Sequence, residues 1–211
     1  MTGATRDGDS PPLLLRCGGE PEALIHRLEG AWAQQRTVAL ADPAEEELLQ
    51  VALAGAQLPP GPAVLVGSGG SRGGRRWCVQ PLEHLQASAG ATARWLEAEG
   101  IDPAAALLLN PLPLHHVSGL LPLVRARQWG AEQRILPPAL LRRPEDLAAA
   151  CPLPPGRAGA LSLVPTQLAR LLESQEAVAW LRRCAVIWVG GAALPRALAG
   201  RARRLELPLA P

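Results

Sequence analysis

A glycine-rich segment stands where one apolar run ends. Residues 64–76 read VLVGSGGSRGGRR and contain five glycines, two serines and three arginines. Glycine lets backbone amides turn toward a phosphate, hydroxyls add donors, and a nearby cation neutralises charge. The segment predicts an anion cradle, although a solvated Gly-Ser-Arg loop would have the same composition. It is not a Walker A loop, because that loop needs a lysine and this chain has none.

Two adjacent histidines lie in a proline-rich segment further along. Residues 110–119 read NPLPLHHVSG and follow the apolar run 106–110, with His115 and His116 at its centre. Open α/β sheets bind ligands at the carboxyl ends of their strands, so these histidines are expected to face a substrate. Metal binding is the weaker hypothesis, because no third ligand is evident nearby. Histidines that only satisfy hydrogen bonds in a turn are the structural alternative.

Two further segments join an apolar run to a helical pattern. Residues 162–167 read SLVPTQ and residues 189–195 read VGGAALP. The Gly190–Gly191 pair would let a flat ring or a phosphate approach the backbone, but the same pair suits a tight turn with no ligand. Trp180 and Trp188 both precede the second segment, and we interpret them as core packing rather than as a stacking platform.

The elements that position these segments alternate between short apolar runs and amphipathic helices. This alternation is the signature of parallel βαβ units, so we expect an α/β fold with a mostly parallel sheet flanked by helices. The expected strands are 63–67, 106–110, 133–136, 160–164 and 185–189. The expected helices are 21–36, a second helix with Asp42 as its cap, 81–99, 166–183 and 195–204.

Composition narrows the function further. The chain has 211 residues, a formal net charge of +2 and 19% charged residues, which argues against a general nucleic-acid binder. Its basic residues are all arginine, so a Schiff base or a lysine nucleophile is excluded. No apolar run is long enough to cross a membrane. The four cysteines form no CxxC pair, which favours reduced thiols in a cytoplasmic protein.

Taken in order, the four segments resemble those of the adenylate-forming superfamily, which includes the AMP-forming acyl-CoA synthetases. That family has a Ser/Thr/Gly-rich phosphate loop ending in lysine, an LPxxHxxG segment and a GGAxL-type segment. The counterparts here are residues 68–75, 112–119 and 190–194. LPLHHVSGL and SLVPTQLARLL look most like the ligases that act on o-succinylbenzoate in menaquinone and phylloquinone synthesis. The resemblance covers roughly residues 60–211.

The resemblance implies a role for each matching residue. The phosphates of ATP would be wrapped by the loop, with Arg75 at the family's lysine position and Arg72 where glycine is more frequent. His116 would lie near the reacting carboxylate as the catalytic residue. The loop residues are Ser68, Gly69, Gly70, Ser71, Gly73, Gly74 and Arg75; the substrate residues are His115, Ser118, Gly119, Thr166 and Gln167; the adenine-packing residues are Gly190, Gly191 and Ala192.

The implied chemistry uses ATP, Mg²⁺ and CoA. A carboxylate attacks the α-phosphate of ATP, giving an acyl-adenylate and pyrophosphate, and the CoA thiol then displaces AMP. The sequence lacks the family's YGxTE segment, whose Glu is associated with Mg²⁺, and the lysine of its C-terminal subdomain. We therefore expect a leader over 1–20, a helical segment over 21–61 and an AMP-binding-type α/β domain over 62–211, truncated before YGxTE. Alone, these 211 residues are not expected to complete the ligation.

Three hypotheses stay open at this point. The chain could be part of an o-succinylbenzoate ligase, or of a ligase for another aryl or acyl acid, whose partners are small molecules and a missing C-terminal portion. It could instead be a non-catalytic module that keeps a nucleotide or anion site. It could also be a remnant whose unfinished sheet exposes an edge that invites association.

Overall fold

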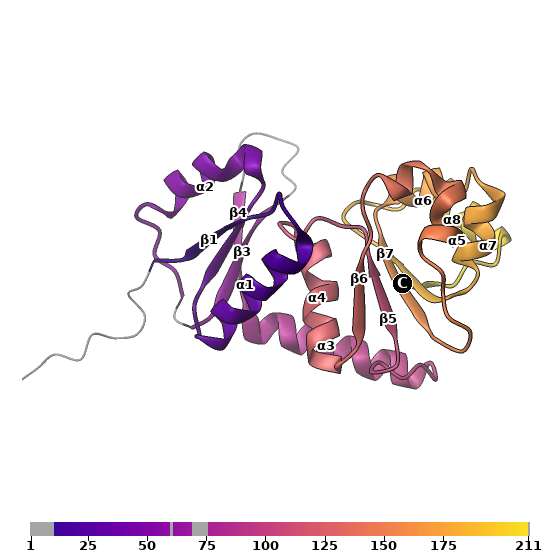
Figure 1. Cartoon of the computed structure of the whole chain (residues 1–211), viewed down its shortest axis with the longest axis horizontal. Helices are drawn as coiled ribbons and strands as arrows, with labels where there is room; N and C mark the ends of the chain where they lie inside the picture. The colour runs from indigo at the N-terminus through magenta and orange to yellow at the C-terminus, as the bar shows by residue number, and fades with distance from the viewer. Residues whose placement is uncertain (1–10, 60, 69–75, 211) are drawn as a thin grey trace, which may run out of the picture. The chain divides into compact units, whose positions relative to one another are not determined.

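The computed structural model describes residues 11–59, 61–68 and 76–210, which form two compact units (Figure 1). The first unit runs to Leu85 and also contains Leu114–Val117. The second unit contains Gln86–Pro113 and the chain from Ser118 onward. Each unit is built around its own sheet, four-stranded in the first and five-stranded in the second.

The first unit holds the sheet β1-β2-β3-β4. β1, β2 and β3 are parallel, whereas β4 returns antiparallel to β3. Ala39, Ala41 and Leu65 form one buried cluster with Leu49 of α2, and α1 buries Leu28 and Trp32. The elements are β1 (Leu13–Arg16), α1 (Pro21–Ala33), β2 (Val38–Ala41), the short 3-10 helix η1 (Pro43–Glu45), α2 (Glu46–Leu53), β3 (Ala63–Ser68) and β4 (Arg76–Pro81).

The second unit holds the parallel sheet β6-β5-β7-β8-β9. The strands are β5 (Leu107–Asn110), β6 (Glu132–Ile135), β7 (Gly159–Leu163), β8 (Cys184–Val189) and β9 (Leu209–Ala210). The helices are α3 (Leu82–Ala98), which begins in the first unit, α4 (Val117–Trp129), α5 (Leu147–Ala150), α6 (Pro165–Leu171), α7 (Gln175–Leu181) and α8 (Arg196–Arg204). Two 3-10 helices, Leu140–Arg142 and Pro144–Asp146, precede α5.

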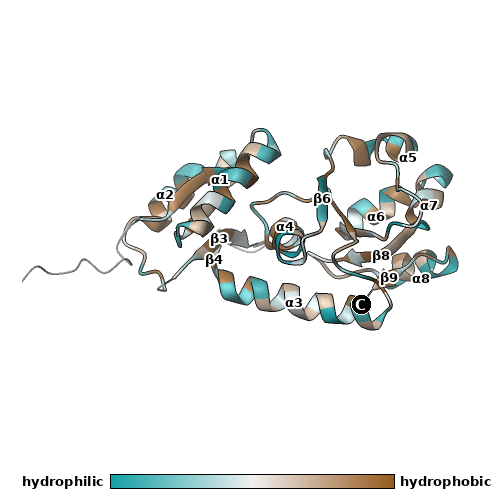
Figure 2. Ribbon diagram, turned by 60° about the horizontal axis from the view of Figure 1, so that its bottom comes forward, coloured by the Kyte–Doolittle hydropathy of each residue, from teal (hydrophilic) through white to brown (hydrophobic). Residues whose placement is uncertain are grey.

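Helices cover both faces of the second sheet. Leu107 and Leu109 pack in one cluster with side chains of α6, α7 and α8. Ala106 and Leu108, which alternate with them, pack with Ala126 of α4 on the other face. Figure 2 shows that the strand β8 is apolar, whereas the helix α8 is mostly hydrophilic. This burial on both faces explains why β5, β7 and β8 read as mostly apolar runs.

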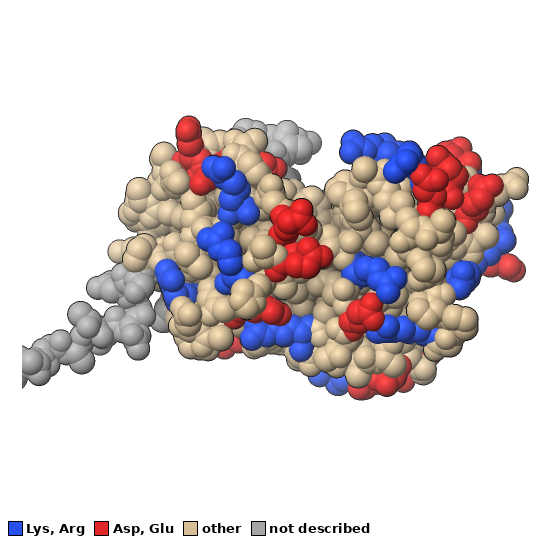
Figure 3. All heavy atoms as spheres, in the orientation of Figure 1, with Lys and Arg blue, Asp and Glu red and all other residues tan. Residues whose placement is uncertain are grey.

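Charged side chains are mixed in sign over each unit on the face shown in Figure 3. All of the basic side chains are arginines. No helix among the described residues combines the length and the apolar character that crossing a membrane requires.

The expected fold class is confirmed, as are the five expected strands and the helices at 21–36, 81–99 and 195–204, within a few residues. The single helix expected over 166–183 is wrong: the chain forms α6 and α7, because Ser174 caps a new helix by accepting a hydrogen bond from the Ala177 amide. α4 was not anticipated at all, because Pro122 inside it interrupts a helical pattern.

The N-terminal part differs most from expectation. The described end of the expected leader contains β1, and the expected helical segment 21–61 contains β2. β3 pairs with β2, and β4 pairs with β3, so residues 63–81 belong to the first unit rather than to the α/β domain expected over 62–211. The pairing partners of β1 and β2 lie far away in sequence, and a local pattern does not reveal them.

Candidate functional site

The carboxyl ends of three adjacent parallel strands meet at one edge of the second sheet. β5 ends at Asn110, β7 is followed by Val164, and β8 is followed by Gly190, whose amide donates to the Leu163 carbonyl at 3.0 Å. Three of the segments chosen from sequence therefore begin at the same edge. Ligand sites of open α/β sheets lie at this edge.

Asn110 organises the turn after β5. Its side chain is fully buried, its Nδ2 donates to the Gly119 carbonyl at 2.8 Å, and its Oδ1 accepts from the Leu112 amide at 3.1 Å. Both polar ends of the amide are thus satisfied inside the protein. The side chain ties the start of β5's turn to the first turn of α4.

Gly119 has a packing role in this turn. A Cβ atom at position 119 would lie 2.1 Å from the Pro113 carbonyl oxygen and 2.6 Å from that of Leu112. Only a residue without a side chain permits this approach. The proposed contact of Gly119 and Ser118 with substrate stays a prediction.

Gln167 also has a structural partner. Its Oε1 accepts from the backbone amide of Val164 at 3.0 Å, which satisfies a donor at the start of α6. Thr166, one residue earlier, is exposed at the same helix end. Of the two predicted pocket residues, Thr166 has the side chain that is open to solvent.

The Gly190–Ala192 turn is exposed after β8. Gly191 has a φ of 78°, a left-handed conformation that favours glycine, and a Cβ there would lie 3.1 Å from Val164 Cγ1. The turn itself carries no side chain larger than the methyl group of Ala192. A planar ring could pack against it, as the sequence predicts.

The two histidines belong to the first unit. The side chain of His115 is 11% exposed, and its Nε2 lies 3.4 Å from Oδ2 of Asp42. The rings of His115 and His116 are 4.4 Å apart between centroids, at an interplanar angle of 57°. Nδ1 of His116 lies 3.5 Å from the Gly67 carbonyl oxygen, a long distance for a hydrogen bond.

Asp42 and Cys17 directly follow the paired parallel strands β2 and β1 of the first unit. Burial, and secondly the charge of Asp42, raise the pKa of the Cys17 thiol to about 12. The thiol is therefore protonated at neutral pH and is not a nucleophile. Cys17 is only partly buried.

The phosphate loop is described only at its two ends. Ser68 and Arg76 pair across β3 and β4, and Ser68 Oγ donates to the Arg76 carbonyl at 3.1 Å. The remaining predicted phosphate contacts lie outside the described residues: Gly69, Gly70, Ser71, Arg72, Gly73, Gly74 and Arg75.

The tryptophans near the edge are part of the core. Trp180 is 2% exposed, and its indole Nε1 donates to the Cys151 carbonyl at 2.7 Å. Trp188 is partly buried, and the guanidinium carbon of Arg125 lies 4.6 Å from its ring centroid. Burial lowers the pKa of Arg125 to about 10, so it stays charged at neutral pH.

Sequence reasoning missed the contributions of Asn110 and of Asp42 to the site. Asn110 was seen only as the end of a strand, and Asp42 only as a helix cap, a role confirmed by its acceptance from the Ala44 amide. An asparagine at the end of an apolar run and before two prolines was the signal that could have identified Asn110. No signal in the sequence indicated the contact of Asp42 with His115. Among described residues, no three His, Cys, Asp or Glu side chains are grouped to hold a metal ion.

Comparison with known proteins found no matching family model and no matching curated protein sequence. Solved structures do match. O-succinylbenzoate coenzyme A synthetase from Bacillus subtilis, in complex with AMP, is 18% identical with a TM-score of 0.63 and covers 97% of this chain. A malonyl-CoA ligase with methylmalonyl-CoA and AMP bound is 17% identical with a TM-score of 0.59 and covers 98%.

A third match is an AMP-forming acyl-CoA synthetase/AMP-acid ligase II-like protein from Dyadobacter fermentans, at 24% identity and a TM-score of 0.53, over 78% of this chain. The chain spans 60%, 58% and 42% of the lengths of these three proteins. It therefore has the fold of a part of the adenylate-forming acyl-CoA synthetases.

Proposed function

We propose that this chain is part of an adenylate-forming acid–thiol ligase, with o-succinylbenzoate as the acid it takes. The observation that carries the proposal is the meeting of three motif segments at the carboxyl ends of β5, β7 and β8, in a fold shared with an AMP-bound o-succinylbenzoate coenzyme A synthetase. The sequence LPLHHVSGL, which resembles that of o-succinylbenzoate ligases, supports this choice of acid.

In the proposed reaction the acyl carboxylate attacks the α-phosphorus of ATP and releases pyrophosphate. A thiol then attacks the acyl carbon of the adenylate and AMP leaves. The chain would contribute binding and orientation: the Gly190–Ala192 turn against adenine, the 68–75 loop against phosphates, and His116 near the carboxylate. Mg²⁺ would neutralise phosphate charge, and no cluster among the described residues is built to hold it alone.

Isothermal calorimetry with ATP and AMP tests the nucleotide site. Ala192→Glu places a negative charge beside the proposed nucleotide, so saturable binding seen with the original chain is expected to fall at least about tenfold. Ala98→Glu adds the same charge at an exposed position of α3 and should bind like the original chain. Absence of saturable heat with either nucleotide would refute the proposal.

Calorimetry with acids tests the substrate. O-succinylbenzoate is expected to bind more tightly than benzoate or malonate in the presence of AMP. Tighter binding of benzoate or malonate would replace the acid in the proposal and keep the ligase class.

The second candidate is a nucleotide-binding module without catalysis, which the absence of lysine favours. ATP–pyrophosphate exchange is a one-sided test of this module, because only a positive result would exclude it. We expect no exchange above a no-protein control from these 211 residues, and a clear excess with o-succinylbenzoate would contradict that expectation.

A further inference from the structure

Asp42 makes two contacts with its two carboxylate oxygens. Oδ1 accepts from the Ala44 amide at 3.0 Å, which caps the short helix η1, and Oδ2 lies 3.4 Å from His115 Nε2. His115 is largely buried, with 11% of its side chain exposed, whereas Asp42 is 38% exposed. A residue at the end of β2 thereby fixes the ring of a histidine that is remote in sequence.

His115 in turn packs on His116. The tilted contact at 4.4 Å restricts the ring of His116, whose Nδ1 faces the Gly67 carbonyl at 3.5 Å. A carbonyl oxygen only accepts hydrogen bonds, so this contact favours a proton on Nδ1. Since the contact is long, it depends on the ring being held in place from its other side. Nε2 is then the nitrogen of His116 left for a ligand.

The charge states of the neighbouring residues favour Asp42 as the group that orients His115. Cys17 is a neutral thiol, and Arg16 is paired with Glu46, to whose Oε2 its Nε donates at 2.6 Å. Asp42 is a charged group in direct contact with His115.

We propose that Asp42 and His115 form a positioning pair that holds His116 in its Nδ1–H tautomer and leaves Nε2 for the ligand. Neither residue of the pair needs to touch substrate. The identity of the ligand as the acyl carboxylate or its adenylate rests on the function proposed above. The tautomer of His116 does not depend on that function.

Imidazole ¹⁵N NMR of the full chain, labelled at histidine, measures the tautomers directly. The chain has four histidines, and His26 and His84 are exposed references in the same sample. In neutral conditions His116 is expected mainly as Nδ1–H, whereas the exposed rings show mainly Nε2–H. A wild-type His116 in the Nε2–H form would overturn the proposal.

Asp42→Asn removes the charge and keeps an oxygen that can cap η1, so the His116 signals are expected to move toward those of the exposed histidines. Asp102→Asn is the matched control, because Asp102 makes the same contact to Ala104 at 3.0 Å and has no histidine ion pair among the described contacts. Unchanged tautomers in folded Asp42→Asn, or equal changes in both variants, would overturn the pair.

His115→Phe provides a second route should Asp42→Asn fold poorly. Phenylalanine keeps an aromatic ring against His116 but cannot be anchored by Asp42. The same loss of the Nδ1–H form is expected, and the double variant should lose no more than either single one. Additive losses would contradict a shared pathway through the pair.

Binding separates this inference from the proposed function. O-succinylbenzoate affinity is expected to drop about tenfold in Asp42→Asn, near the value of one weakened charge-assisted hydrogen bond, while ATP affinity is unchanged. If the wild type binds no acid, the proposed function fails and the tautomer result still decides the pair. If acid binding is equal while the tautomer differs, the ligand half of the inference is overturned.

Discussion

At the scale of residues, Asn110 stabilises the turn that follows β5 at the candidate site of the second sheet. It satisfies the Leu112 amide and the Gly119 carbonyl at a position with no solvent exposure. Removing the side chain would leave both backbone groups without this partner.

Asn110→Ala is therefore expected to lower the free energy of unfolding by about 1–3 kcal/mol for each backbone group left unsatisfied. Urea unfolding followed by tryptophan fluorescence measures the loss. Gln128→Ala on the exposed side of α4 is the control and should change stability by less than about 0.5 kcal/mol. Equal stability of both variants would contradict the role given to Asn110.

Substitution by alanine is expected to change stability in opposite directions at Gly119 and Gly30. Gly119→Ala forces a methyl group onto the Pro113 carbonyl, 2.1 Å away, so a severe loss of stability is expected. Gly30 lies in α1 with nothing within 4 Å of its would-be Cβ. Gly30→Ala should raise stability by about 0.5–1 kcal/mol, since alanine is the better helix former. Thermal unfolding of the two variants checks both signs.

At the scale of elements, Ser174 decides that one apolar stripe becomes two helices. Its Oγ accepts from the Ala177 amide at 3.1 Å at the start of α7. The same hydroxyl donates a hydrogen bond to the Glu176 carboxylate at 2.8 Å. The pKa of Glu176 is lowered first by a hydrogen bond from its own backbone amide and then by the hydrogen bond from Ser174.

Ser174→Ala is expected to cost about 1 kcal/mol, the usual value of a lost N-cap. Ser88→Ala, at an exposed position inside α3, removes a hydroxyl where alanine is the better helix former. Denaturant midpoints should fall for the first variant and stay level or rise for the second. A fall in both would point to a general effect of the lost hydroxyl.

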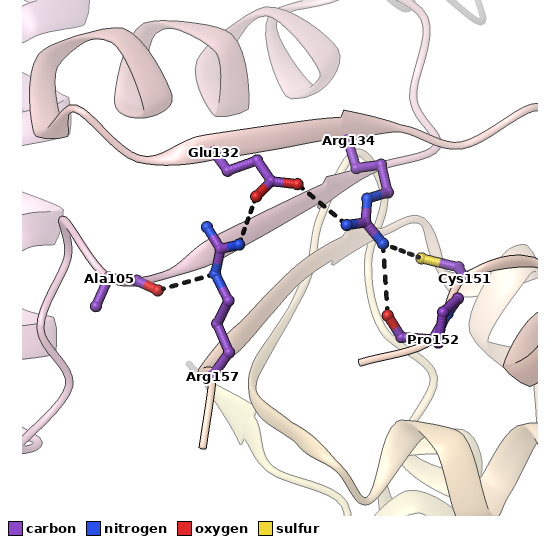
Figure 4. Close-up of polar contacts among 6 residues, drawn as sticks. All are labelled: Ala105, Glu132, Arg134, Cys151, Pro152 and Arg157. Atoms are coloured by element: carbon purple, nitrogen blue, oxygen red, sulfur yellow. Dashed lines mark hydrogen bonds and ion pairs between the residues drawn. The ribbon is translucent and has the colours of Figure 1, made fainter. Parts of the chain in front are cut away.

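The edge strand β6 is secured by the ion-pair network in Figure 4. Glu132 accepts from Arg134 at 3.0 Å and also pairs with Arg157, which in turn donates to the Ala105 carbonyl at 3.3 Å. Arg134 further donates to the Pro152 carbonyl at 3.4 Å. Charged side chains at a sheet edge also discourage pairing with another chain.

Hydrogen bonds from Arg157, and then from Arg134, lower the pKa of Glu132. A carboxyl group with a lowered folded-state pKa stabilises the fold above its unfolded pKa, near 4.3, and loses that contribution as pH falls through the folded value. Glu132→Gln is thus expected to cost only about 0.2–1 kcal/mol per exposed pair at pH 7, and the deficit should shrink below pH 4 and in high salt.

Unfolding of Glu132→Gln across pH 3–7 checks this dependence, with Glu97→Gln as the control, because Glu97 is an exposed glutamate on α3. A deficit of Glu132→Gln that stays constant down to pH 3 would exclude the charge of Glu132 as its cause.

At the scale of the whole molecule, the four cysteines report on the two units separately. Cys17 and Cys78 lie in the first unit, and Cys151 and Cys184 in the second; all are free thiols. Burial is the first cause that raises the pKa of Cys17 and of Cys184 to about 12. At pH 8 only about one in ten thousand of either thiol is ionised.

Native chain treated with a maleimide at pH 7–8 is therefore expected to be labelled at Cys78 before Cys17: both are partly exposed, but the raised pKa of Cys17 leaves almost no thiolate there. Cys17 and Cys184 should become reactive only as their own unit opens, and peptide mass spectrometry would then give an unfolding profile for each unit. Labelling of Cys184 as fast as Cys78 without denaturant would contradict the burial described here.

The sequence by itself determined the α/β class, five strands, most long helices and the three segments that follow β5, β7 and β8. It did so because apolar runs, glycines and prolines act locally, and because parallel strands bring their carboxyl ends to one edge. The phosphate and substrate roles of the candidate residues stay predictions.

Only the tertiary structure decided what depends on partners distant in sequence. β1, β2 and β4 are identified only by their pairing, β1 with β2, β2 with β3 and β4 with β3, and that pairing places residues 63–81 in the first unit. The contact of Asp42 with His115 likewise exists only once β2 and the histidine turn meet. A hydrogen-bonding or charged group has no preferred partner in local sequence, so its partner is fixed by packing.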